Sequence, residues 1–252
     1  MSSSDVPDRT GSEPPDPTAP NDGSEGGSPD VPRDGSQGGP DDRSPDGPTP
    51  RAPVRGAATE IDPRWIERIL LSQPRVGEVR VVCIDGPAGS GKTTLAAELA
   101  VVLESSFGEV PVVHGDEVYE GWPVVAAAPD RIAAFAMLAG RIDTWLFDRW
   151  RHGFDAEHPR WDWHADSWGD PVVVPAAPVV VLEGVSLGSH PLRARSVLSI
   201  WVDCDPALRL PRVLARDGDA LAAEMAGWQR DEHVWHQLDE TAFGCDVSLV
   251  TG

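Results

Sequence analysis

Lysine is almost absent from this chain of 252 residues, which contains 20 arginines but a single lysine, Lys92. A coding bias toward G and C would replace lysine with arginine in this way, and the 25 glycines and 25 prolines fit the same bias. A position that keeps lysine under such a bias is one where the bulkier, planar guanidinium cannot replace a compact ammonium group. Lys92 is therefore the first candidate for a functional residue.

Positive charge is scarce as a whole, because 21 basic residues face 41 acidic ones and leave a formal net charge of -20. Proteins that bind nucleic acids or anionic membranes need clustered cationic side chains. The charge therefore predicts neither a nucleic-acid partner nor a membrane partner. It favours a small-molecule substrate.

Cysteine and long apolar runs are also scarce. Cys83, Cys204 and Cys245 have no Cys-x-x-Cys spacing and lie in or beside apolar runs, so we interpret them as buried reduced thiols. The seven histidines show no ligand spacing either, and no zinc site is predicted. The longest apolar run, 172–182, is broken by two prolines, and the N-terminus has no basic region followed by an apolar one. We expect a cytoplasmic protein.

Large apolar residues are missing from the first part of the chain, where Pro, Gly, Ser and Asp predominate. Such a composition cannot bury enough apolar surface to offset the entropy lost on ordering. Residues 1–57 are therefore predicted to be a disordered tail. Residues 58–252 are rich in Val, Ala, Leu and Trp and are long enough to form one compact domain with a hydrophobic core.

Strand and helix patterns alternate along the predicted domain. Strands are predicted at 80–85, 110–114, 179–183, 196–203 and 246–250, and helices at 61–71, 93–106, 129–151, 206–216 and 220–237. This order implies βαβ crossovers, and hence a three-layer α/β/α fold with a mainly parallel five-stranded sheet. The Trp-rich stretch 160–170 is predicted to be an ordered loop.

A glycine-rich loop joins the strand at 80–85 to the helix at 93–106 and matches the P-loop pattern G-x-x-x-x-G-K-[ST] in full. Its glycines let backbone N–H groups point at a phosphate, and the helix N-terminus adds partial positive charge. Lys92 is predicted to reach the β- and γ-phosphates, and Thr93 to place its hydroxyl on Mg²⁺. The predicted nucleotide-binding residues are Gly86, Pro87, Ala88, Gly89, Ser90, Gly91, Lys92, Thr93 and Thr94.

Two carboxylates follow the second predicted strand, in the segment His114-Gly-Asp116-Glu117-Val-Tyr119. Open α/β sheets bind ligands at this end of their strands, and a metabolite kinase needs a carboxylate there to accept the proton of the attacking hydroxyl. The segment resembles the D-x-x-Y type segment of the uridine kinase and phosphoribulokinase group of P-loop kinases. The resemblance implies that Asp116 is the general base and that Tyr119 shapes the acceptor pocket. The alternative is an acidic helix cap or a solvent-facing pair.

The third predicted strand ends in Glu183-Gly184, which resembles the "hydrophobic run, Glu, Gly" of the same kinases. The resemblance implies that Glu183 holds Mg²⁺ through water. A strand-terminal carboxylate without a metal is the alternative.

Three arginines, Arg209, Arg212 and Arg216, are spaced to share one face of a helix. The family has an arginine-bearing helical lid at this place, which implies that Arg212 and Arg216 are the catalytic pair. The alternative is an ordinary solvated arginine face. The segment from Trp228 to Trp235, followed by Cys245-Asp246-Val247, resembles the C-terminal part of the same kinases. Its Glu232 either orients the lid or pairs with Arg230.

The acceptor side departs from the family, because the chain lacks the Asp-His-Pro segment that follows the second strand of uridine kinases. It has instead a segment in which Trp161 and Trp163 could stack on a planar base, with Arg160, Asp162 or His164 at the edge of the base. Closure of the hydrophobic core by the same aromatic side chains is an equal alternative.

The resemblance as a whole implies a kinase that uses ATP and Mg²⁺ to phosphorylate a hydroxyl of a small metabolite, with uridine or cytidine as the first candidates. The missing Asp-His-Pro segment favours a non-nucleoside acceptor as the alternative. A P-loop ATPase switch or assembly factor would be a different class, but the chain has no N-K-x-D signature. A degenerate paralogue that binds nucleotide without catalysis is disfavoured by the presence of Lys92, Thr93, Asp116 and Glu183. The sequence indicates neither the oligomeric state nor a preference between ATP and GTP.

Overall fold

The computed structural model describes residues 54–55, 61–121, 131–163 and 165–252. The predicted disordered tail lies outside these residues, apart from Val54 and Arg55, which form the short strand β1 (Val54–Arg55). Among the helices of the described part, none is both long enough and apolar enough to cross a membrane. The three cysteines are free thiols, two of them buried and Cys245 partly exposed.

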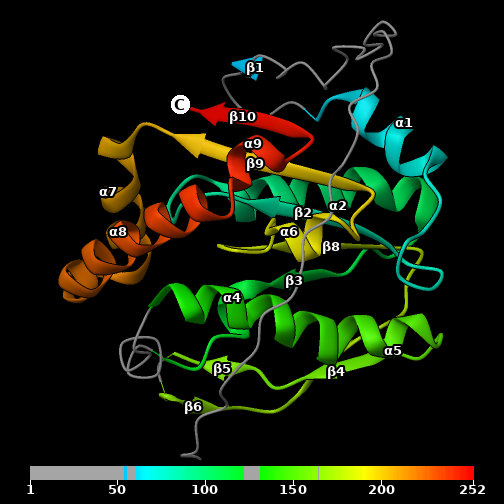
Figure 1. Cartoon of the computed structure of the whole chain (residues 1–252), viewed down its shortest axis with the longest axis horizontal. Helices are drawn as coiled ribbons and strands as arrows, with labels where there is room; N and C mark the ends of the chain where they lie inside the picture. Colours follow the sequence, from blue (N-terminus) through cyan, green and yellow to red (C-terminus); the bar gives the residue numbers. More distant parts are fainter. Residues whose placement is uncertain (1–53, 56–60, 122–130, 164) are drawn as a thin grey trace, which may run out of the picture. The chain divides into compact units, whose positions relative to one another are not determined.

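A parallel sheet forms the centre of the structure and confirms the predicted fold class (Figure 1). Its strand order is β1-β10-β9-β2-β8-β3, so β1 adds a short edge strand to the five predicted ones. Their bounds are β2 (Arg80–Asp85), β3 (Val112–His114), β8 (Val179–Glu183), β9 (Leu198–Cys204) and β10 (Val247–Thr251). The chain leaves β2 toward β3 on one side and later continues to β9 on the other. This switch of direction places the carboxyl end of β2 where open α/β sheets bind ligands.

The two faces of the sheet contribute to two separate apolar clusters. Val81 and Cys83 of β2 belong to one cluster, while Val82 and Ile84 belong to the other. Both faces of β2 are therefore buried, which explains why its sequence is a continuous apolar run rather than an alternating one.

Helices cover both faces of the sheet. Helix α2 begins at the P-loop lysine and packs its buried leucines in the cluster of Val82 and Ile84. Helices α4 and α8 contribute to the cluster of Val81 and Cys83. The main helices are α1 (Pro63–Leu71), α2 (Lys92–Phe107), α4 (Arg131–Ile142), α5 (Asp148–Arg151), α7 (Pro206–Asp217) and α8 (Ala222–Leu238). A π-helical turn, Asp143–Phe147, joins α4 to α5, while the predicted start of this helix at Pro129 lies outside the described residues.

The stretch 160–170, predicted to be a loop, contains a small hairpin instead. Strands β5 (Trp161–Asp162) and β6 (Ser167–Trp168) pair antiparallel, and the ring centroids of Trp161 and Trp168 are 5.1 Å apart. A second pair, β4 (Ala156–His158) with β7 (Val172–Val174), flanks the hairpin in sequence. Strands of two or three residues carry too little alternation to be seen in a sequence, and cross-strand aromatic pairs stabilise them.

Helices α7 and α8 lie beyond the arrowheads of β9 and β10 (Figure 1). Asp205 caps α7, because its carboxylate accepts the backbone N–H of Ala207 at 2.9 Å. The carboxyl end of the sheet is thus enclosed by α7 and α8, which carry the predicted lid arginines and Glu232.

Candidate active site

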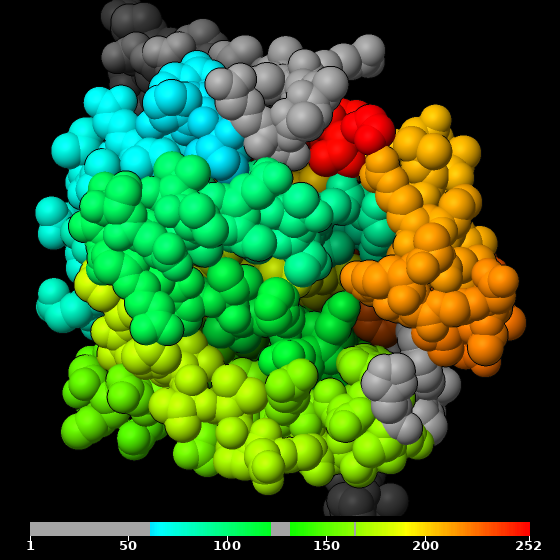
Figure 2. All heavy atoms as spheres, turned by 180° about the vertical axis from the view of Figure 1, so that it is seen from behind, coloured from blue at the N-terminus to red at the C-terminus, as the bar shows by residue number. Residues whose placement is uncertain are grey.

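A cavity of about 1440 Å³ opens at the carboxyl ends of β2, β3 and β8. Figure 2 shows the molecule hollowed where the orange residues of α7 and α8 meet the green and yellow-green segments. The predicted nucleotide, catalytic, metal and acceptor residues among the described ones line this cavity, except Gly86, Pro87 and Ser90, which are buried in the protein. Arg209 and Glu232 are not part of its lining. The predicted nucleotide, metal, base and acceptor residues therefore share one site.

The glycines of the P-loop have backbone conformations that other residues rarely adopt. Gly89 and Gly91 have positive φ values of 84° and 98°. A Cβ at Gly86 would lie 1.9 Å from the carbonyl oxygen of Val202, and one at Gly89 would lie 2.4 Å from that of Arg209. The loop therefore approaches the neighbouring backbones so closely that only glycine fits at these two positions.

Lys92 is buried at the first position of α2, and its Nζ donates to the carbonyl oxygen of Pro87 at 3.0 Å. Helix α2 has 16 residues, so its N-terminal partial charge adds to that of the ammonium. The two contributions make this end of the cavity suitable for phosphate groups.

Thr93 and Glu183 meet at the floor of the cavity, where the threonine hydroxyl donates to Glu183 Oε1 at 3.1 Å. The same carboxylate oxygen lies 2.6 Å from Nδ1 of His114. Burial favours a higher pKa for Glu183, but the hydrogen bond with His114 and the charge of Lys92 lower the pKa below its ordinary value. A hydroxyl beside an ionised carboxylate is a donor set that suits Mg²⁺.

His114 was not predicted as a site residue. The hydrogen bond with Glu183 raises the pKa of this histidine above its ordinary value. No sequence pattern indicates the pair, because the two residues meet only when β3 pairs with β8. The described residues contain no group of three or more His, Cys, Asp or Glu side chains that could hold a metal ion.

Asp116 lies in the 3₁₀ turn Gly115–Glu117 that follows β3. Its side chain lines the cavity and is exposed there, with the protein atoms of the cavity wall close enough to displace part of its solvent. These surroundings and the negative charge of Glu183 raise the pKa of Asp116, while the charges of Lys92 and Arg216 oppose the rise. The positive charges of Lys92 and Arg216, which are predicted to act on the phosphates, therefore also act on the Asp116 carboxylate.

The acceptor side of the cavity is formed by the hairpin and the turn after β3. Trp163 donates its ring N–H to the carbonyl oxygen of Asp116 at 2.9 Å, which ties the hairpin to the predicted base. Arg160 lies 3.2 Å from a carboxylate oxygen of Glu117. Trp161 packs against Trp168, is almost fully buried and lines the cavity as well. The predicted edge residue His164 lies outside the described residues.

Tyr119 is buried at the back of this side. Its hydroxyl donates to the carbonyl oxygen of Val185 at 3.2 Å, and its ring meets that of Trp228 edge-on at 5.2 Å. The side chain lines the cavity. Because both its ring and its hydroxyl have partners in the protein, Tyr119 gives this wall of the cavity a fixed shape.

The arginines of α7 differ in their contacts. Arg212 and Arg216 line the cavity, and Arg216 is held by two hydrogen bonds of 2.7 Å to Asp217. Arg212 donates to the carbonyl oxygen of Gly252 at 2.6 Å and to that of Gly89 at 3.5 Å. Helix α7 therefore contacts the P-loop directly.

The sequence left two alternatives for Glu232, which were to orient the lid or to pair with Arg230. The structure shows no pairing of Glu232 with Arg230. Residues two apart on a helix point in different directions. The Glu232 carboxylate is fully buried, accepts the N–H of Ala88 and lies 3.7 Å from Arg209. Burial raises its pKa to about 7.

Known proteins resemble the chain in sequence and in fold, although no model of a protein family matches it. A uridine kinase from Deinococcus deserti is 34% identical over 155 residues, which cover 56% of this chain and 70% of that protein. The structure of a possible uridine kinase from Bacillus stearothermophilus covers 74% of this chain and 96% of its own, with 21% identity and a TM-score of 0.52. A candidate fructose transport system kinase from Silicibacter sp. TM1040 covers 73% and 97%, with 20% identity and a TM-score of 0.51.

The two structures share the fold, and the sequence relative shows the family. A parallel sheet with a complete P-loop at a central strand, together with a kinase relative, defines the chain as a P-loop kinase. Within that class, the chain belongs to the uridine kinase-like family.

Proposed function

We propose that the protein transfers the γ-phosphoryl group of ATP to a hydroxyl of an uncharged small metabolite, with uridine or cytidine as the first candidates. The observation that carries the proposal is the shared cavity. Lys92 and the P-loop lie at one side, Asp116 stands at the end of β3, and an aromatic hairpin lies beyond it. Such an arrangement places an acceptor hydroxyl between a base and a phosphoryl donor.

On the donor side, the P-loop amides, Lys92 and the N-terminus of α2 bind the β- and γ-phosphates of ATP. Arg212 and Arg216 add positive charge from α7 and help to exclude water from the reacting groups. Thr93 and Glu183 would hold Mg²⁺. When bound, the ion neutralises charge on the phosphate oxygens.

On the acceptor side, Asp116 accepts the proton of the attacking hydroxyl as the oxygen approaches the γ-phosphorus. The raised pKa of its carboxyl makes Asp116 a better base than an ordinary aspartate. The opposing charges of Lys92 and Arg216 keep the carboxylate form accessible. Catalysis is then mainly positioning and neutralisation of charge.

The charge of the acceptor side supports an uncharged acceptor. Among the described residues that line it, four carboxylates accompany one guanidinium, that of Arg160, which already faces Glu117 at 3.2 Å. These carboxylates belong to Asp116, Glu117, Asp162 and Asp170. A phosphorylated or carboxylated acceptor would be repelled by this excess of negative charge. The Trp161 and Trp163 rings suit a planar base, which favours a nucleoside.

A panel of acceptors tests the proposal. Purified protein is incubated with ATP or GTP, Mg²⁺ and either uridine, cytidine, neutral sugars and alcohols, or a sugar phosphate, and new phosphate esters are detected by ³¹P NMR and mass spectrometry. Phosphorylation of a nucleoside that is abolished in Lys92→Ala supports the proposal. Phosphorylation of a neutral non-nucleoside supports the alternative acceptor. ATP hydrolysis without transfer to any acceptor contradicts a kinase of this kind and favours a switch.

A further inference from the structure

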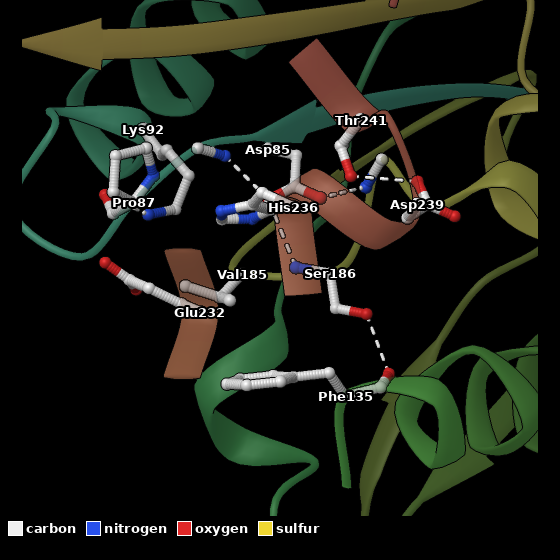
Figure 3. Close-up of polar contacts among 12 residues, drawn as sticks. Asp85, Pro87, Lys92, Phe135, Val185, Ser186, Glu232, His236, Asp239 and Thr241 are labelled. Atoms are coloured by element: carbon white, nitrogen blue, oxygen red, sulfur yellow. Dashed lines mark hydrogen bonds and ion pairs between the residues drawn. The ribbon is translucent and has the colours of Figure 1, made fainter. Parts of the chain in front are cut away.

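Helix α8 directs two buried polar side chains toward the P-loop. Glu232 and His236 are one helical turn apart, and their side chains are 0% and 7% exposed. Figure 3 shows both side chains directed toward the segment from Asp85 to Lys92. A buried charged or polar group requires a partner, and both have theirs at the base of the loop.

Glu232 holds the middle of the loop. Its carboxylate oxygens lie 2.9 and 3.2 Å from the backbone N–H of Ala88, which follows Pro87. Lys92 donates to the carbonyl oxygen of Pro87, so the lysine and the carboxylate hold opposite sides of one peptide group, that between Pro87 and Ala88. Arg209 of α7 lies 3.7 Å from the Glu232 carboxylate, so α7 also contacts the group that holds Ala88.

His236 holds the start of the loop through Asp85, the last residue of β2. The Asp85 carboxylate accepts the N–H groups of Gly86 at 2.6 Å, Ser186 at 3.1 Å and Gly188 at 2.8 Å. Since Asp85 acts as an acceptor, Nε2 of His236 donates to it at 3.2 Å. The ring of His236 is fixed in turn by an edge-on contact with Trp201, with centroids 4.6 Å apart.

We propose that Glu232 and His236 are positioning residues that fix the P-loop in its phosphate-binding conformation. The inference deepens the proposed function and rests on it, because the positioned groups are those that bind ATP. The loop is held on both sides of Pro87, at Gly86 through Asp85 and at Ala88 through Glu232. Loss of either contact lets the loop amides and Lys92 move relative to the phosphates.

The charge of Glu232 also affects the affinity of the P-loop for ATP. The groups that face its carboxyl are Lys92, His236, Arg209 and, farther off, Tyr119. An ionised carboxylate under the loop opposes a bound triphosphate and takes up part of the charge of Lys92. Because the pKa of Glu232 is about 7, the carboxyl is neutral below neutral pH and ionised above it. ATP affinity therefore falls as the pH rises through this range.

The test measures ATP binding by isothermal titration without an acceptor, at about pH 6 and about pH 8. Removal of the carboxyl in Glu232→Ala leaves the Ala88 N–H unpaired, and at the lower pH, where the wild-type carboxyl is neutral, it should weaken ATP binding about tenfold. In Glu232→Gln the amide oxygen still accepts that N–H. This variant should match the wild type at the lower pH and bind ATP more tightly than the wild type at the higher pH. The titration of ATP itself is common to all proteins and cancels in the comparison.

Matched variants separate positioning from folding. Glu224→Gln makes the same change at an exposed position of α8 and should leave binding unaltered. His236→Leu should weaken ATP binding about tenfold, and His236→Gln, which restores an N–H donor, should recover it. The inference is overturned if Glu232→Ala binds ATP as the wild type does at the lower pH, or if Glu232→Gln shows the pH dependence of the wild type. Binding of ATP without phosphorylation of any acceptor would instead contradict the proposed function alone.

Discussion

Replacement of Glu232 by glutamine should change how stability depends on pH. Burial raises the pKa of Glu232 from 4.5 to about 7, so the folded protein binds a proton that the unfolded chain releases at lower pH. A group with a raised pKa stabilises the fold fully below its unfolded value and loses that contribution as the pH rises through the folded value. At about 1.4 kcal/mol per pKa unit, the whole loss is about 3 kcal/mol.

Urea unfolding of the wild type and Glu232→Gln at about pH 5 and about pH 8 measures this loss, of which about 2 to 3 kcal/mol falls between these pH values. Other titrating groups contribute equally to both proteins, so the difference between the two pH profiles isolates Glu232. The glutamine variant should gain stability relative to the wild type as the pH rises. Exposed Glu224→Gln serves as the control. Parallel profiles for wild type and Glu232→Gln would refute the raised pKa and the burial that causes it.

Two further predictions concern the P-loop and the floor of the cavity. Gly89→Ala should lower the free energy of unfolding by more than Gly108→Ala, because both have positive φ but only Gly89 faces a backbone oxygen, at 2.4 Å. Equal losses of unfolding free energy in the two variants, measured by urea unfolding, would show that helix α7 shifts to make room for the added methyl group at little cost. Glu183→Gln should lower the pKa of His114 toward its ordinary value, since the hydrogen bond with Glu183 raises it. An NMR titration of the His114 ring in both proteins checks this, and an unchanged pKa would mean that the two side chains do not interact.

Much of the fold is encoded locally and was predicted from the sequence. The run at 80–85 is apolar throughout because β2 is buried on both faces, and the predicted helix at 93–106 is α2, Lys92–Phe107. The hairpin of Trp161 and Trp168 was missed because its strands have two residues each. What stabilises such strands is a cross-strand contact, which local periodicity does not contain.

The candidate site likewise has a part that the sequence predicts and a part that it does not. The P-loop is a continuous segment whose glycine spacing follows directly from its backbone, so it was visible at once. The contacts of Glu183 with His114 and of Glu232 with Ala88 join residues 69 and 144 positions apart in the chain. They depend on strand order and on the packing of α8, and no spacing pattern records them. The spacing of Glu232 and His236 shows only that they share a helix face.

The most direct measurement is single-turnover phosphoryl transfer by Asp116→Asn, with the acceptor found in the panel and with ATP affinity measured in parallel. Asparagine keeps the shape of the side chain but accepts no proton. Transfer should therefore slow by about 10²- to 10⁴-fold, while ATP affinity stays close to that of the wild type. Transfer at the wild-type rate would contradict the assignment of Asp116 as the base that faces the P-loop across this cavity.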